Sequence, residues 1–285
     1  GSEMCIRDSS MAERDSGFIQ IYAENNQEAY DNYLMAHRIG ETPDVRLPVM
    51  ICEDGFITSH ALENIELEED EAVKAFVGEY HPENYLLKHE NPLAVGPYGT
   101  SPYYMEARVA QAEAMKNAKR AILDVAADFE KTFGRKYGLF EAYRMEDAEL
   151  AIVLMGSSAG TAKAAVDELR ESGVKAGLIK IRVFRPFPGE ELAEALKDCK
   201  AVAVLDKSEG FSACGGPLFA ETASACINLT QRPKMVDIVY GLGGRDFTVA
   251  QAKRVFARLE KIVSTGEVGP IYSHMGQRDL REDVQ

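Results

Sequence analysis

The sequence predicts an α/β fold in two halves, and the clearest evidence lies near the middle of the chain. Residues 151–155 are apolar, Gly156 ends the run, and an alanine-rich segment of helical periodicity follows. This is the pattern of a buried strand that enters a helix. The alternation continues to the C-terminus, so we expect four parallel strands with helices on both faces. The predicted strands are 149–155, 174–183, 200–205 and 234–240, and the predicted helices are 159–171, 189–198, 216–229 and 248–264.

The first half shows the same alternation over a shorter distance. Residues 18–22 predict a strand, 25–39 a capped helix and 47–52 a second strand, and two parallel strands need a helical crossover of this length. A connector rich in Glu, Pro and Gly covers residues 61–108, and residues 105–133 have the periodicity of a long amphipathic helix that bridges the halves.

These elements divide the chain into four segments. Residues 1–10 continue none of the predicted helices or strands, and we expect them to be a non-native leader. The other segments are a partial N-terminal domain with its connector at 11–104, a bridging helix and linker at 105–147, and a doubly wound α/β domain at 148–285.

Composition and charge exclude several classes of partner. The chain of 285 residues is 46% hydrophobic and carries 46 acidic against 32 basic side chains, a formal charge of −14. This balance argues against binding to nucleic acid or to an anionic membrane. No apolar run approaches the eighteen or so residues of a membrane span, and the N-terminus lacks the order of a signal peptide. A cytoplasmic protein is therefore expected.

The five cysteines are far apart and form no C-x-x-C pair, so we expect neither an iron–sulfur cluster nor a structural zinc in this chain. Cys214 lies in a loop rich in Ser and Gly, but no histidine is close in sequence to activate its thiol. The histidines also lack the spacing of metal ligands. Neither a catalytic cysteine nor a metal site is predicted.

Two turns are candidates for a functional site, and the first joins strand 149–155 to its helix. Ser157 and Ser158 can cap the helix, Gly160 lets strand and helix approach closely, and the free amide groups extend to Thr161. Such a turn can hold a phosphate or a carboxylate, or it is an ordinary helix cap. Its G-x-x-x-G spacing lacks the dinucleotide-binding fingerprint, so both interpretations stay open.

The second turn follows strand 47–52 and contains Asp54, Ser59 and His60. It lies at the edge where α/β sheets place their binding crevice. These side chains suit a strand-end turn that bonds its own backbone, or they support an active site or contact another subunit. His60 is the best candidate for a group that titrates near neutral pH. A glycine-rich loop at 240–246 suits either a tight turn or a ligand.

Six short segments, taken in order along the chain, carry a resemblance to a known family. They are residues 11–17, 24–31, 54–60, 156–161, 184–188 and 240–246. From Met11 to its C-terminus the sequence resembles the alpha subunit of pyruvate:ferredoxin oxidoreductase. The resemblance implies the C-terminal part of a pyrimidine-type thiamine-diphosphate-binding domain over 11–104. Over 148–285 it implies a doubly wound domain similar to the transketolase C-terminal domain.

The resemblance also implies the chemistry of a whole complex. That complex oxidatively decarboxylates pyruvate with coenzyme A to acetyl-CoA and CO2 and reduces ferredoxin, or runs the reverse reaction. Close relatives act on 2-oxoglutarate or branched-chain 2-oxoacids, and either substrate is an alternative here. Thiamine diphosphate and iron–sulfur clusters are expected in the complex, where beta, gamma and delta-type subunits are the partners.

The family's thiamine-activating glutamate and its pyruvate-binding threonine and arginine match no position of this sequence. We therefore expect an N-terminally truncated chain without catalytic residues, which alone binds no cofactor and is inactive. A stand-alone module that binds an anion or a nucleotide, built on residues 149–264, is the alternative from another functional class.

Overall fold

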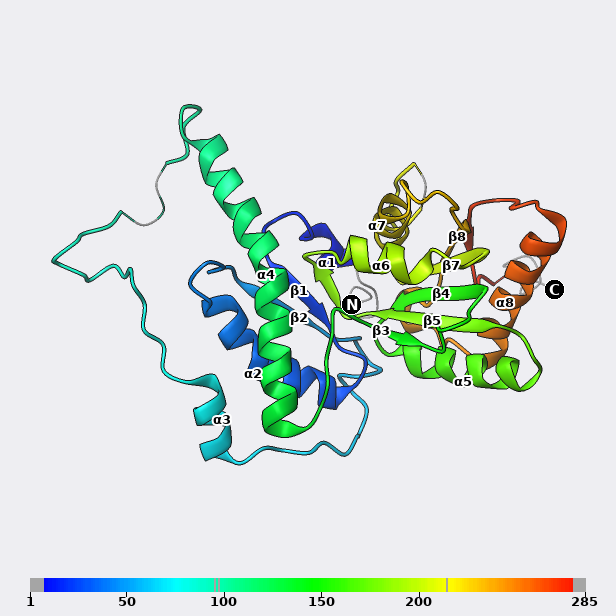
Figure 1. Cartoon of the computed structure of the whole chain (residues 1–285), viewed down its shortest axis with the longest axis horizontal. Coiled ribbons are helices and arrows are strands. Elements are labelled where there is room, and N and C mark those ends of the chain that lie inside the picture. The colour runs from blue at the N-terminus through cyan, green and yellow to red at the C-terminus, as the bar shows by residue number, and fades with distance from the viewer. Residues whose placement is uncertain (1–7, 95, 97, 214, 279–285) are drawn as a thin grey trace.

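Two β-sheets divide the chain, and one continuous segment takes part in both (Figure 1). The computed structural model describes residues 8–94, 96, 98–213 and 215–278, so Cys214 lies outside the described residues. The first sheet has the strand order β2-β1-β6, and the second has the order β3-β5-β4-β7-β8-β9. Only Arg182 separates β5 (Ala176–Ile181), in the second sheet, from β6 (Val183–Arg185), in the first.

The second sheet confirms the predicted α/β class but has more strands than predicted. Five of its strands run parallel, and β3 pairs antiparallel with β5 along one edge. The prediction of four strands was wrong because β3 and β9 are only four and three residues long, too short for a clear periodicity. The bounds are Phe140–Tyr143 for β3, Leu150–Met155 for β4, Ala201–Asp206 for β7, Lys234–Val239 for β8 and Tyr272–His274 for β9.

Helices cover both faces of this sheet, as predicted, because its strands are apolar on both faces. In β4, Leu150, Ile152 and Leu154 lie in one hydrophobic core with α5 and α8, whereas the alternate residues Ala151 and Val153 lie in another with α6 and α7. The bounds are Ser158–Glu171 for α5, Gly189–Leu196 for α6, Pro217–Ala225 for α7 and Val249–Thr265 for α8, and a short 3-10 helix, η2, covers Leu242–Gly244.

The first sheet contains the predicted strand, helix and strand. β1 (Ile19–Tyr22) and β2 (Val49–Cys52) pair in parallel and are joined by α2 (Asn26–Glu41). Asn25 caps α2 by accepting the Glu28 N–H at 2.8 Å, which satisfies an otherwise unpaired amide. On the other side of β1, β6 pairs antiparallel.

The N-terminal helix α1 (Asp8–Ala12) lies against this sheet. The Gln20 side chain donates to the Ser10 carbonyl at 2.7 Å, and the Tyr22 hydroxyl donates to Ser10 Oγ at 2.8 Å. These contacts tie the end of the segment predicted as a leader to the folded chain.

The long helix predicted over 105–133 is α4 (Tyr104–Phe133), but only its C-terminal half packs against the molecule. Its buried side chains lie between Ala118 and Phe129, whereas residues 104–110 are exposed. Val109, in this first part of the helix, is 52% exposed. The free end of α4 projects from the body together with the connector that precedes it (Figure 1), and that connector contains one further helix, α3 (Asp70–Val77).

The predicted strand 174–183 is wrong at its C-terminal end, because β5 stops at Ile181. Arg182 then turns the chain into the other sheet, and its buried guanidinium donates to Asn32 Oδ1 at 3.0 Å and to the Gly138 carbonyl at 3.1 Å. An apolar run shows that a segment is buried, but it does not show in which sheet the segment lies.

Gly160 does not serve close packing, contrary to the prediction. An added Cβ at Gly160 would have no heavy atom within 4 Å. Gly177 in β5 is one of several glycines that are crowded: a Cβ there would lie 2.5 Å from Met145 Sδ and 2.8 Å from Ala148 Cβ. A packing constraint of the kind predicted for the turn is therefore found in β5.

Gly177→Ala is expected to lower the free energy of unfolding by about 1–3 kcal/mol, because the added methyl overpacks a buried strand. Gly160→Ala is the matched control: the same methyl enters open space in a helix, where alanine is favoured over glycine by up to about 1 kcal/mol. Urea unfolding followed by circular dichroism measures both variants. Equal midpoints for the two variants would contradict the assignment of the crowded site.

Candidate functional site

The carboxyl ends of β4 and β7 meet where the second sheet changes direction. From β4 the chain passes through α5 to β5 on one side, and it later returns through α6 to β7 on the other side of β4. Ligands of open α/β sheets bind in the crevice above such a switch point. Ser157 follows β4 at this place, and Lys207 follows β7.

Asp54, from the first half of the chain, fills this position. It is 5% exposed, and its Oδ2 accepts the Ser157 backbone N–H at 2.7 Å and the Ser157 hydroxyl at 2.5 Å. Lys207 Nζ lies 3.5 Å from Asp54 Oδ1, and both side chains are buried. Gly156 makes the turn possible with a left-handed φ of 71°. The predicted anion-binding turn therefore binds a carboxylate of the same chain.

The two turns predicted as separate candidates thus meet through Asp54 and Ser157. The Ser157 hydroxyl bonds Asp54, and Ser157 makes no side-chain cap of α5. The other candidates of the same turn lie at the start of α5: Ser158 is buried, Thr161 is half-buried and Gly160 is exposed. Of these four residues, Ser157 makes the contact with the carboxylate.

Ser59 and His60 lie at the surface. Ser59 Oγ accepts the Phe56 N–H at 3.0 Å and lies 2.7 Å from His60 Nδ1. The rings of Phe56 and His60 are 4.7 Å apart, and Phe56 has a left-handed φ of 66°, an uncommon conformation for a bulky residue. The turn after Asp54 is therefore ordered by its own side chains and presents an aromatic and an imidazole ring to solvent.

Two buried aspartates that sequence reasoning missed lie on the neighbouring strands. Asp206 ends β7 and accepts the N–H groups of Leu218 and Phe219, at 3.1 and 2.9 Å, in the first turn of α7. Asp237 in β8 accepts the Gly216 N–H at 2.6 Å. Burial, assisted by the negative charge of Glu209, raises the pKa of Asp237 to about 6. An aspartate inside an apolar strand is unusual, and that pattern was the available signal.

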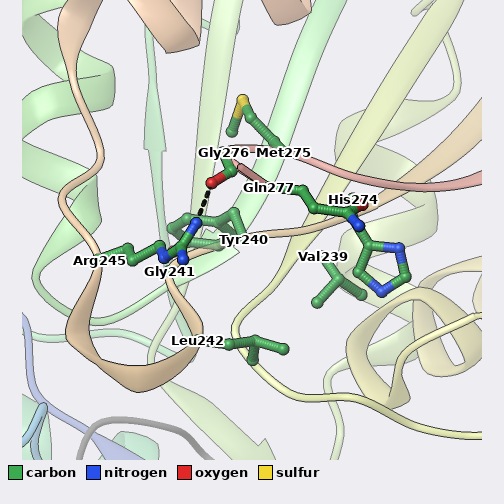
Figure 2. A pocket seen from close by; sticks show the side chains of 9 residues that line it. All are labelled: Val239, Tyr240, Gly241, Leu242, Arg245, His274, Met275, Gly276 and Gln277. Carbon is green, nitrogen blue, oxygen red and sulfur yellow. Dashed lines mark hydrogen bonds between the residues drawn. The ribbon is translucent and has the colours of Figure 1, made fainter. Parts of the chain in front are cut away.

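A pocket of about 330 Å³ opens where β8 and β9 end (Figure 2). The predicted glycine-rich loop forms part of it with Gly241, Leu242 and Arg245. The Arg245 guanidinium donates to the Gly276 carbonyl, which closes the loop against the chain that follows β9. The loop is therefore a tight turn that also lines a cavity, and ligand binding by its glycines stays a prediction.

His274 lies on the other side of this pocket and is exposed. Its Nε2 lies 2.8 Å from Glu209 Oε2 and 3.1 Å from the Tyr272 hydroxyl, which also donates to Glu209. Although burial opposes the shift, the hydrogen bonds from Tyr272 and His274 lower the pKa of Glu209. Glu209, Tyr272 and His274 thus form a polar cluster between the loop after β7 and strand β9.

At the switch point, the described residues form no metal cluster, and Asp54 takes the position in which a diphosphate would meet the turn. Within residues 8–94, 96, 98–213 and 215–278, no group of three His, Cys, Asp or Glu side chains is placed to hold a metal ion. Burial raises the pKa of the Cys199 thiol to about 12, so that thiol is inert. The Ser157 amide, which would meet a phosphate, is occupied by Asp54, whose charge would repel one.

In the part of the chain that the structure describes, no helix combines the length and the apolar character needed to cross a membrane.

Two family models match the chain in sequence order. Residues 6–127 match "Pyruvate flavodoxin/ferredoxin oxidoreductase, thiamine diP-bdg", and residues 148–252 match "Pyruvate:ferredoxin oxidoreductase core domain II". The pyruvate synthase subunit PorA of Pyrococcus furiosus is 41% identical over 269 residues, which are 94% of this chain and 68% of that protein. The chain belongs to the PorA family of pyruvate synthase subunits. The family identified by the resemblance of the six segments is confirmed.

Other relatives of this PorA-family chain have names that specify different substrates. The pyruvate synthase subunit PorA of Thermotoga maritima is 49% identical over 252 residues, 88% of this chain and 64% of that protein. The ketoisovalerate oxidoreductase subunit VorA of Pyrococcus horikoshii is 44% identical over 260 residues, 91% of this chain and 65% of that protein. The chain thus spans slightly less than two thirds of the length of these two relatives.

A solved structure supports the fold of the PorA-family chain. The 2-oxoglutarate:ferredoxin oxidoreductase from Magnetococcus marinus superposes with a TM-score of 0.53 at 13% identity, over 85% of this chain and 42% of that chain. At this level of identity the match concerns the architecture alone.

Asp54→Asn is expected to destabilise the PorA-family chain by about 3 kcal/mol, because it leaves the buried Lys207 ammonium without the nearby negative charge. The asparagine keeps the size of the side chain and an acceptor for Ser157. Lys207→Met should cost a similar amount, and the double variant should cost less than the sum of the two by at least about 1 kcal/mol. Urea unfolding of the four proteins measures this coupling, and additive costs would contradict it.

The stability of the PorA-family chain should fall with pH through Asp237. Its folded-state pKa of about 6 lies above the ordinary value of 3.8, so its contribution is complete below about pH 4 and is lost as the pH rises through 6. Ionisation at pH 8 costs about 3 kcal/mol. Asp237→Asn keeps an acceptor for the Gly216 N–H and cannot ionise, so its advantage over the wild type should grow between pH 5 and pH 8. Parallel profiles of unfolding free energy against pH would refute this assignment.

Proposed function

We propose that this chain is part of the alpha subunit of a pyruvate:ferredoxin oxidoreductase. The observation that carries the proposal is the 49% identity to the pyruvate synthase subunit PorA of Thermotoga maritima over 88% of this chain. In the reaction, pyruvate and coenzyme A give acetyl-CoA and CO2, and two electrons pass to ferredoxin. The reverse carboxylation consumes the same two electrons from reduced ferredoxin.

Pyruvate is favoured over the other 2-oxoacids by the Thermotoga maritima relative. Its PorA is 49% identical to this chain, whereas the VorA and the PorA of Pyrococcus horikoshii are 44% and 41% identical. Support for 2-oxoglutarate is limited to a shared architecture at 13% identity. A branched-chain 2-oxoacid is therefore the second candidate substrate.

The proposal assigns the cofactors to the assembly and not to this chain alone. Thiamine diphosphate supplies the nucleophilic carbon for decarboxylation when it is bound, and iron–sulfur clusters carry the electrons to ferredoxin. The partners are beta, gamma and delta-type subunits in the cytoplasm. Supporting this assignment, the sequence lacks C-x-x-C pairs, and the described switch-point crevice holds Asp54 where a phosphate would bind.

The role of this chain in the assembly is to hold two domains in a fixed relation. We propose the domains to be 11–104 and 148–285, with 105–147 as the bridge. Asp54, Ser157 and Lys207 join them through buried contacts, and Ser59 and His60 are available at the surface for active-site support or subunit contact. A stand-alone anion-binding module is less supported, because the turn that would bind the anion already binds Asp54.

The purified chain alone is expected neither to bind thiamine diphosphate tightly nor to reduce a viologen dye with pyruvate and coenzyme A, because both need the partner subunits. The gene product that carries this chain, co-expressed with beta, gamma and delta-type subunits, should show pyruvate-dependent dye reduction. A kcat/KM for 3-methyl-2-oxobutanoate or 2-oxoglutarate above that for pyruvate would overturn the substrate assignment. Turnover by the chain alone would overturn the subunit role.

A further inference from the structure

The exposed apolar side chains of this molecule are concentrated in one stretch of the chain. Among the described residues, 21 large hydrophobic side chains are exposed, and 15 of them lie between Phe56 and Val109. That stretch is less than a fifth of the 285 residues. Scattered exposed apolar residues are ordinary, but a concentration of this kind marks an interaction surface.

Ten of these 15 side chains lie in a projecting arm, defined here as residues 78–94 and 98–110. It contains a long irregular connector and the first turns of α4, and it extends away from both sheets (Figure 1). Leu87, Tyr98 and Tyr103 are 73%, 90% and 73% exposed. Irregular connectors of this length inside a domain are usually functional or disordered, and a segment rich in Tyr and Leu lacks the composition of disorder.

The sequence of the arm has the composition of a protein interface. Residues 91–105 contain no Asp, Glu, Lys or Arg, although 27% of the chain is charged. The same stretch contains three tyrosines and Met105. Interface cores are enriched in tyrosine and methionine and depleted in charge, so the composition and the exposure of the arm agree.

An acidic segment lies next to this neutral surface. Residues 61–90 contain nine acidic and two basic side chains, a formal charge of −7, which is half of the −14 of the whole chain. Glu69, Asp70 and Glu79 are exposed. A partner that covers the arm therefore also meets a strongly negative border.

These charges argue against a second copy of the same chain as the partner. An isologous contact between two arms would place −7 opposite −7, and like charges across an interface cost affinity. The body of a second copy is also a poor partner, because many of its cations are already paired. Arg135 pairs with Asp31 and Glu68, and Lys200 pairs with Glu149.

We propose that the arm docks in an apolar groove, bordered by lysine and arginine, on a different protein subunit. The inference rests on the proposed function in one respect: the partner is taken to be a subunit of the same oxidoreductase. The apolar part of the arm supplies the buried contact, and the acidic segment steers the approach and fixes its direction.

The test uses co-expressed beta, gamma and delta-type subunits and the gene product that carries this chain. The arm variant combines Leu87→Ala, Tyr98→Ala and Tyr103→Ala. The matched control combines Tyr33→Ala, Phe211→Ala and Ile227→Ala, which are 64%, 93% and 58% exposed outside the arm. All six side chains are exposed, so both variants should fold, and circular dichroism with urea unfolding verifies this.

Affinity for the partner subunits, measured by interferometry, should fall about 100-fold in the arm variant and less than about threefold in the control. Wild-type binding should weaken about tenfold between roughly 0.05 and 0.5 M salt, because the acidic border is screened. An arm variant that binds like the wild type would overturn the inference. So would a wild-type chain that binds none of the subunits, or one that forms a dimer by light scattering that the arm variant abolishes.

The proposed function is tested by a separate measurement, pyruvate-dependent dye reduction by the same assemblies. An assembly that depends on the arm but lacks turnover with any 2-oxoacid would overturn the function and support the arm. An active assembly that the arm variant leaves intact would overturn the arm and support the function.

Discussion

The structure depends on a single chain segment that passes from one sheet into the other with two charged side chains buried at the crossing. The Lys180 ammonium lies 2.9 Å from a carboxylate oxygen of Glu28 and 3.0 Å from one of Glu24. Arg182 is 2% exposed. Although burial opposes it, the charges of Glu28 and Glu24 raise the pKa of Lys180. An unpaired buried charge costs several kcal/mol, roughly 3–5 when one partner is removed. The start of α2, with Glu28, and Glu24 just before it must therefore stay where they meet β5.

The crossing also determines where the candidate site forms. The Tyr22 N–H donates to the Arg182 carbonyl at 2.7 Å, and β6 then pairs with β1. Strand β2 lies on the other side of β1, so its carboxyl end has a fixed position relative to the second sheet. Asp54 therefore reaches the turn after β4. The strand pairing therefore explains why Asp54 fills the crevice. Without the first half of the chain, the turn at Ser157 would be open to solvent.

The sequence predicted the elements whose signals are local and long. The strand at 149–155, the helix at 105–133 and the order of strand, helix and strand in the first half agree with the structure to within one or two residues. Periodicity failed for β3 and β9, which are too short, and for the segment 174–183, where the pattern is the same on both sides of Arg182. The local pattern holds no information about which sheet a strand joins.

The candidate site was partly predictable for the same reason. Asp54 and Ser157 were recognised because polar residues follow buried strands at a sheet edge, but they are 103 positions apart, and only the tertiary fold shows that one satisfies the other. Lys207 was missed because a lysine after a strand is ordinary unless it is buried. Gly160 was misassigned because the sequence does not distinguish a glycine in open space from one against a side chain, such as Gly177.

The arm is exposed although both of its ends are firmly held. Phe76 at the end of α3 packs against Phe129 and Phe133 of α4, with ring centroids 5.3 and 5.4 Å apart, and the Arg38 guanidinium lies 4.6 Å from the Phe76 ring. The chain therefore leaves the core after Val77 and returns to it along α4 at Ala114. A segment held at both ends has lost part of the conformational entropy that docking would otherwise cost. The packing of α3 on α4 thus prepares the arm for a partner without covering its apolar surface.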